Sequence, residues 1–132
     1  FSGIYGGKRQ RLLESVRRGE LTAEEPVLFS NRIHCDDCAG VIVHLLQQAA
    51  TTRLAPCYLA SDDEPASLFE VTHWLADQLR IPSSQRQALP SRRRSGSKRC
   101  RNHRLVESGY QFQYPSYREG YKEVISRYLQ SD

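Results

Sequence analysis

The chain has 132 residues, which is enough for one domain with a modest hydrophobic core. Apolar residues make up 39% of it and charged residues 26%, the balance of a globular protein that is slightly polar. No run approaches the eighteen or so apolar residues that a membrane helix needs, and no export signal is visible. We therefore expect no membrane partner. Four cysteines without a dense disulfide framework favour the reducing cytoplasm.

The net charge of +4 arises in one stretch of the chain. Between Arg80 and Arg104 all charges are basic, whereas the remainder has an excess of acids. Residues 83–97 are rich in Ser, Arg, Gln and Pro, and no aromatic residue interrupts them. We predict a mobile basic loop at about 83–97. Binding of nucleic acid or another anionic polymer through Arg86–Arg104 is the alternative function.

Short apolar segments alternate with a helical pattern in the first thirty residues. Phe1–Tyr5 and Val27–Phe29 are predicted strands. Between them, apolar residues at helical spacing over Leu12–Val16 predict a helix that Gly19 ends. We predict an acidic loop over Glu20–Pro26.

The next segment is predicted to be a strand followed directly by a helix. Arg32–Cys35 is a short extended run. Asp37 stands before a long apolar series, where its carboxylate could cap the first N–H groups of a helix. The predicted helix covers Asp37–Ala50, and because it is apolar on most faces we expect it to be largely buried.

The second half continues the alternation of strands and helices. Cys57–Ala60 is a predicted strand, and Asp62–Pro65 is a turn whose acids we expect to be solvated. Ser67 and Glu70 have the spacing of a capping box for a helix over Leu68–Leu79.

The tail is predicted to contain one strand and two helical segments. Arg99–Cys100 is a short strand, Asn102–Ser108 a helical turn that Gly109 closes, and Ser116 the cap of a final helix. Strands that alternate with helices throughout the chain indicate an α/β fold in a single domain, 1–132.

Four blocks of sequence carry a resemblance to a known family. The blocks are Ser2-Gly3-Ile4-Tyr5-Gly6, Asn31-Arg32-Ile33-His34-x-Asp36-Asp37-x-Ala39, Tyr58-Leu59-Ala60-Ser61-Asp62-Asp63-Glu64-Pro65 and the tail from Lys98 to Gly120. In this order they resemble the C-terminal portion of the extended short-chain dehydrogenase/reductases, the NAD-dependent epimerase/dehydratase family. The resemblance implies the substrate-binding part of a Rossmann-like NAD(P)-binding fold, without its N-terminal dinucleotide-binding half.

The missing features are as informative as the matching ones. The chain has neither the glycine fingerprint that places a pyrophosphate on a helix N-terminus nor a Tyr-x-x-x-Lys pair. We therefore predict no catalytic residue here and no NAD or NADP bound by this chain alone. By resemblance, the full-length enzyme would use NAD or NADP to move a hydride to or from a carbinol carbon. The expected partners are the N-terminal half of the same protein and a small-molecule substrate, with self-association as a further expectation.

The resemblance also implies which residues face ligands. Gly3 and Ile4 would lie beside the cofactor, and the expected substrate-binding residues are Ser2, Tyr5, Arg9, Asn31, Arg32 and His34. Nucleotide-sugar members of the family commonly carry Asn at the position of Gly3 and a phosphate-binding Arg at the position of Ser30. Both departures argue against a nucleotide-sugar substrate. Arg32 could bind an acidic group of the substrate instead, or it could pair with an acid on the protein surface.

Cys35 and Cys38 form a Cys-x-x-Cys, which invites a zinc or redox interpretation. A structural zinc site usually needs two close pairs of ligands, and Cys57 and Cys100 are too far apart in sequence to form the second. We predict that Cys35 and Cys38 hold no metal, form no disulfide and that Cys38 packs as an apolar residue.

Overall fold

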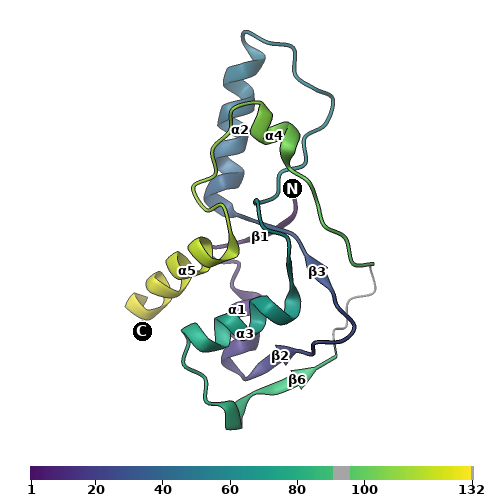
Figure 1. Cartoon of the computed structure of the whole chain (residues 1–132). Helices are drawn as coiled ribbons and strands as arrows, with labels where there is room; N and C mark the ends of the chain where they lie inside the picture. The colour runs from purple at the N-terminus through teal and green to yellow at the C-terminus, as the bar shows by residue number, and fades with distance from the viewer. Residues whose placement is uncertain (91–95, 132) are drawn as a thin grey trace.

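The computed structural model describes residues 1–90 and 96–131 and shows an α/β chain (Figure 1). Its elements in order are β1 (Gly3–Tyr5), α1 (Arg11–Arg17), β2 (Glu20–Thr22), β3 (Phe29–Ser30), β4 (Arg32–His34), α2 (Cys35–Ala49), β5 (Ala66–Ser67), α3 (Leu68–Gln78), the 3-10 helix η1 (Ser83–Gln85), β6 (Gln87–Leu89), α4 (His103–Glu107) and α5 (Tyr117–Ser131). Within the described ranges, no helix is long and apolar enough to cross a membrane.

The strands form three small sheets of two strands each. β1 and β4 are parallel, with Gly3 opposite Arg32 and Tyr5 opposite His34. β2 pairs with β6 in parallel, and β3 with β5 in antiparallel orientation. The β1–β4 pair is the centre of the predicted site, because it sets two segments of the resemblance side by side.

Two hydrophobic clusters divide the molecule. The larger cluster packs α1, α3 and α5 together around Leu13, Val71 and Tyr117. The smaller cluster lies between α2, α4 and the start of the chain, around Ile33, Val41 and Leu105. Figure 1 shows the corresponding division: α2 and α4 lie at one end, and α1, α3, β2 and β6 at the other.

The predicted start of α3 is confirmed. The Ser67 hydroxyl accepts the backbone N–H of Glu70 at 3.1 Å, and the Glu70 carboxylate accepts the backbone N–H of Ser67 at 3.0 Å. Ser116 likewise accepts the Arg118 N–H at 3.2 Å at the start of α5. Both helices thus begin where the sequence pattern placed them.

The predicted cap of α2 is wrong. The helix begins at Cys35, and its cap is His34, whose Nδ1 accepts the backbone N–H of Asp36 at 3.2 Å. Asp37 is fully buried and uses its carboxylate elsewhere: it accepts the Tyr110 hydroxyl and two backbone N–H groups of the tail. The carboxylate that the local sequence pattern assigned to the helix cap therefore makes tertiary hydrogen bonds instead.

The expected burial of α2 is also wrong. Val41 is buried, and Cys38 and Leu45 pack beside it into the smaller cluster, as predicted for Cys38. Ile42 and Val43, however, are half exposed, because no other element of the described chain covers that side of the helix.

Several predicted strands and loops need correction. Cys57–Ala60 and Arg99–Cys100 are not strands, because neither forms a backbone ladder with another described segment; Cys57–Ala60 makes a single backbone hydrogen bond to the start of the chain, from the Ser2 N–H to the Ala60 carbonyl. The acidic loop at Glu20–Pro26 begins instead with β2, which pairs with β6 inside the expected mobile loop. The strand expected at Val27–Phe29 is shifted to Phe29–Ser30. Residues 91–95 of the predicted basic loop lie outside the described residues.

Candidate functional site

A cleft of about 610 Å³ lies beside the β1–β4 pair. Six of the eight residues that the sequence assigned to ligands line this cleft: Gly3, Ile4, Tyr5, Arg9, Asn31 and Arg32. Its volume is in the range of small-molecule sites. Residues near the first and the second sequence block therefore line one cavity.

Arg32 brings a buried positive charge to this cleft. The side chain is only 5% exposed, one guanidinium nitrogen donates to the Ser30 hydroxyl, and Nη1 has no hydrogen-bond partner. The guanidinium also lies over the ring of Tyr117 at 5.3 Å. Among the described residues, no carboxylate is within ion-pair distance of Arg32. A buried cation in this state strongly favours a nearby negative group.

Tyr5 and Tyr121 form the aromatic wall of the cleft. Their rings stack with centroids 4.4 Å apart. The Tyr5 hydroxyl is buried without a partner, and it lies against Gly120 of α5, where any Cβ would collide with it. Burial raises the pKa of both phenols, to about 12 for Tyr121, so both are neutral near pH 7. The wall therefore offers rings and an uncharged hydroxyl.

Asp62 is a feature that the sequence analysis missed. The predicted turn was expected to be solvated, but Asp62 is 1% exposed and only Asp63 of the two aspartates faces solvent. Burial raises the pKa of Asp62 to about 7, although the charge of Arg32 acts in the opposite direction. Its Oδ1 accepts the Glu64 N–H at 3.2 Å, and its Oδ2 has no partner. The signal available in the sequence was its place two residues after the end of the apolar run Cys57–Ala60.

Asp62 also lines a second cavity, of about 820 Å³, with Asn102 and Arg99 from the tail. Asn102 donates to the Asp63 carboxylate at 2.7 Å and to the Ser61 carbonyl at 2.8 Å. This cavity is where the tail packs on the 61–63 turn, and none of the ligand residues expected from the sequence reaches it.

The rim of the first cleft is basic. Lys8, Arg9 and Arg11 line it together with a single acid, Glu14. These residues follow the Gly6-Gly7 turn, in which both glycines adopt positive φ. Basic residues around a partly enclosed cavity raise the local concentration of anions.

The other two expected ligand residues do not line the cleft. Ser2 donates its backbone N–H to the Ala60 carbonyl at 2.9 Å. His34 is 1% exposed, caps α2 through Nδ1, and places Nε2 at 3.3 Å from the Glu123 carboxylate. Asn31 does line the cleft, but its amide donates to the Lys98 carbonyl and accepts the Cys100 N–H. Asn31 thus ties β4 to the tail.

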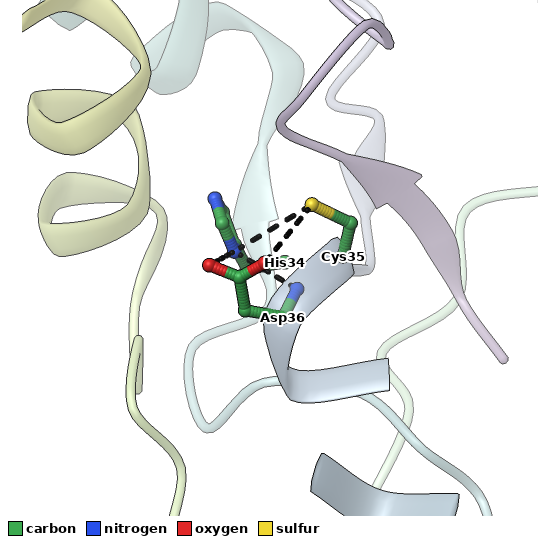
Figure 2. Close-up of side chains that lie close together, drawn as sticks. All are labelled: His34, Cys35 and Asp36. Carbon is green, nitrogen blue, oxygen red and sulfur yellow. Dashed lines mark hydrogen bonds and ion pairs between the residues drawn. The ribbon is translucent and has the colours of Figure 1, made fainter. Parts of the chain in front are cut away.

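Figure 2 shows a cluster with metal-ligand chemistry, His34, Cys35 and Asp36, whose ligand atoms lie within 4.8 Å of one another. The lone pair of His34 Nδ1 already accepts the Asp36 N–H. Burial, and then the neighbouring Asp36 carboxylate, raise the pKa of the Cys35 thiol, which disfavours the thiolate that a metal needs. The proximity of these three side chains is therefore explained by their positions at the start of α2. The absence of metal at Cys35 and Cys38 stays a prediction.

The arginines of the basic stretch are dispersed over separate contacts. Arg86 pairs with Asp77 at 2.7 Å, Arg99 lies over the Phe29 ring at 4.8 Å, and Arg104 donates to the Cys57 carbonyl. Residues 92–94 lie outside the described part of the chain. Arg86, Arg99 and Arg104 do not favour the anionic-polymer alternative, because each is held by its own neighbour.

Solved structures share this fold over nearly the whole chain. A candidate NAD-dependent epimerase/dehydratase from Methylobacillus flagellatus is 32% identical, with a TM-score of 0.79 over 98% of this chain and 46% of that one. The chain matches proteins of the NAD-dependent epimerase/dehydratase family. The resemblance inferred from the four sequence blocks is confirmed.

Two further structures share the fold. A functionally unknown conserved protein from Silicibacter pomeroyi is 25% identical, with a TM-score of 0.76 over 96% of this chain and 47% of that one. A human epimerase family protein, solved with NADPH, is 19% identical and shows the same fold with a TM-score of 0.73 over 93% of this chain and 45% of that one. The chain spans less than half the length of each structure. No protein-family model and no curated protein matches it.

Proposed function

We propose that this chain is the C-terminal, substrate-binding part of an NAD(P)-dependent epimerase, dehydratase or reductase. The observation that carries the proposal is the cleft beside β1 and β4, in which six of the eight expected ligand residues meet. The partner is the N-terminal dinucleotide-binding half of the same protein, and the cofactor is NAD or NADP. The human structural relative binds NADPH.

The residues present fit only one end of the cofactor. Gly3 and Ile4 line the cleft. Gly3 presents only its backbone there, and a Cβ at this position would come within 3.2 Å of the Asn31 carbonyl. Such a wall suits the flat nicotinamide ring, which supplies or accepts a hydride when bound. The glycine fingerprint that holds the pyrophosphate at a helix N-terminus is absent from the sequence.

The remaining residues of the cleft bind and orient the substrate. Arg32 places a permanent positive charge at its floor, and Lys8, Arg9 and Arg11 extend this charge along the rim. Tyr5 and Tyr121 exclude water from the aromatic wall. The arrangement favours a substrate that carries an acidic group next to its carbinol or carbonyl carbon.

The test uses a joined protein, in which the N-terminal part of the Methylobacillus flagellatus protein precedes Phe1 of this chain. Calorimetric titration with NADPH should show no micromolar affinity for the chain alone and clear binding for the joined protein. Absorbance of NADPH then follows its oxidation with acidic and neutral carbonyl compounds. Tight NADPH binding by the chain alone, or none by the joined protein, would contradict the proposal.

A further inference from the structure

Arg32 and Asp62 belong to one buried polar cluster that links the two cavities. The Asp62 N–H donates to the Arg32 carbonyl at 2.8 Å, which holds the 61–63 turn against β4. Arg32 lines the cleft, and Asp62 lines the second cavity. Within the described residues, Arg32 Nη1, Asp62 Oδ2 and the Tyr5 hydroxyl are buried without a hydrogen-bond partner. Such atoms are rare in folded proteins, so three of them in one cluster indicate a role beyond packing.

The charge of this cluster near pH 7 depends on Asp62. The Tyr5 and Tyr121 phenols are neutral, because burial raises the pKa of both. Arg32 is charged at any ordinary pH. Burial raises the pKa of Asp62 to about 7, against the attraction of Arg32. The cluster is therefore positive while Asp62 holds a proton and electrically neutral when Asp62 is ionised.

The other charged groups around Asp62 have partners of their own or lie toward the second cavity. Asp63 accepts the Asn102 amide, and Glu64 pairs with Arg118. After burial, the charges of both carboxylates also act to raise the pKa of Asp62. Three residues of the tail line the second cavity with Asp62: Arg99, Arg101 and His103. None of these charged groups lines the cleft. Arg32 therefore links the charge of Asp62 to the cleft.

We propose that Asp62 controls the affinity of the cleft for anions: an anionic group binds at Arg32 more tightly while Asp62 holds a proton. The inference rests on the proposed function, since it concerns the acidic group of the proposed substrate. An anion at Arg32 offsets the attraction that favours the Asp62 carboxylate, so binding of the anion and uptake of the proton favour each other. Asp62 lines the second cavity and not the cleft, so the coupling is electrostatic and needs no contact with the anion.

The expected size of this coupling is about tenfold. Two linked ligands usually change each other's affinity by about 5–150-fold, and a factor of about ten equals one pKa unit. With a pKa of about 7, Asp62 is almost fully protonated at about pH 5.5 and almost fully ionised at about pH 8.5. The affinity for an anion should therefore fall by about sevenfold as pH rises across this range.

Titration of the chain with pyruvate, whose carboxylate stays ionised over this range, tests the coupling. The affinity, measured by NMR at both pH values, should fall by about sevenfold. Asp62→Asn fixes the neutral form, so it should retain the high affinity at both pH values. Loss of a residue that only supports the fold would lower the affinity instead. Asp63→Asn is the matched control, because Asp63 is the exposed neighbour, and it should keep the pH effect within about twofold.

The carboxyl carbon of Asp62 gives a second readout, assigned by its loss in Asp62→Asn. Its titration midpoint should rise by about one pH unit when pyruvate saturates the chain. An unchanged midpoint, a pH-independent affinity or no binding of pyruvate would overturn the inference. NADPH titration of the joined protein separates it from the proposed function. NADPH binding with an unchanged Asp62 midpoint refutes this inference alone, and a midpoint that responds to pyruvate without NADPH binding refutes the proposed function alone.

Discussion

Replacing Asp37 by asparagine should destabilise the chain far more than the same change at its neighbour Asp36. The buried carboxylate of Asp37 accepts the Tyr110 hydroxyl at 2.7 Å, the Gln113 N–H at 2.8 Å and the Tyr114 N–H at 2.9 Å. These bonds fasten α2 to the tail between α4 and α5. A hydrogen bond to a charged group contributes about 1.5–3 kcal/mol, roughly twice a neutral one.

Asparagine retains one carbonyl oxygen for the Tyr110 and Gln113 donors but turns an N–H group toward the Tyr114 N–H. One charged bond is lost and two become neutral, so we expect a loss of about 2–4 kcal/mol. That is a large share of the roughly 5–15 kcal/mol that stabilises a domain. Asp36 is 43% exposed at the first turn of α2, where its charge contributes only about 0.3–1 kcal/mol.

The assay is equilibrium unfolding in urea of the two single variants and the unchanged chain. The midpoint of Asp37→Asn should fall well below that of Asp36→Asn, with the slope of the transition unchanged. Equal midpoints for the two variants would refute the role assigned to the Asp37 carboxylate. The two aspartates are neighbours in the sequence, and the expected difference comes from the burial and the three hydrogen bonds of Asp37.

Three further predictions concern other residues. The pKa of the Asp62 carboxyl is 3.8 in the unfolded chain and about 7 in the folded one. The free energy of unfolding should therefore fall as pH rises through this window, by about 4 kcal/mol at most. Asp62→Asn should remove this pH dependence, measured by thermal unfolding at a series of pH values. Ser67→Ala removes the hydroxyl of a capping box and should cost about 1 kcal/mol in chemical denaturation, while an unchanged midpoint would show that the box is not needed. Cys35→Val with Cys38→Leu should leave the fold intact, and elemental analysis should find no zinc before the change; about one zinc per chain that disappears on substitution would show that the packing account is wrong.

The sequence predicted best where local signals and tertiary packing agree. The start of α3 followed from Ser67 and Glu70, because a capping box is satisfied within four residues. Parallel pairing of β1 with β4 was not predicted from the sequence, but it explains why ligand residues predicted from two sequence blocks share one cleft.

The failures have a common physical cause in contacts between distant segments. β2 at Glu20–Thr22 exists because Gln87–Leu89 lies beside it, and neither segment has the composition of a strand. Asp37 does not cap α2, because its carboxylate accepts hydrogen bonds from donors more than seventy residues away, and His34 caps the helix instead. Asp62 was expected in solvent because the burial of a turn depends on what packs over it, which the local sequence does not encode.

The most direct test of the central claim is steady-state oxidation of NADPH by the joined protein with paired acidic and neutral carbonyl compounds. The account predicts turnover of at least one acidic compound, with a KM that rises about tenfold in Arg32→Lys, which keeps the charge but loses the planar fork. Neutral compounds should be insensitive to that change, and Arg86→Lys, outside the cleft, should affect neither class. A KM for acidic compounds that Arg32→Lys leaves unchanged would contradict the assignment of this cleft to the substrate.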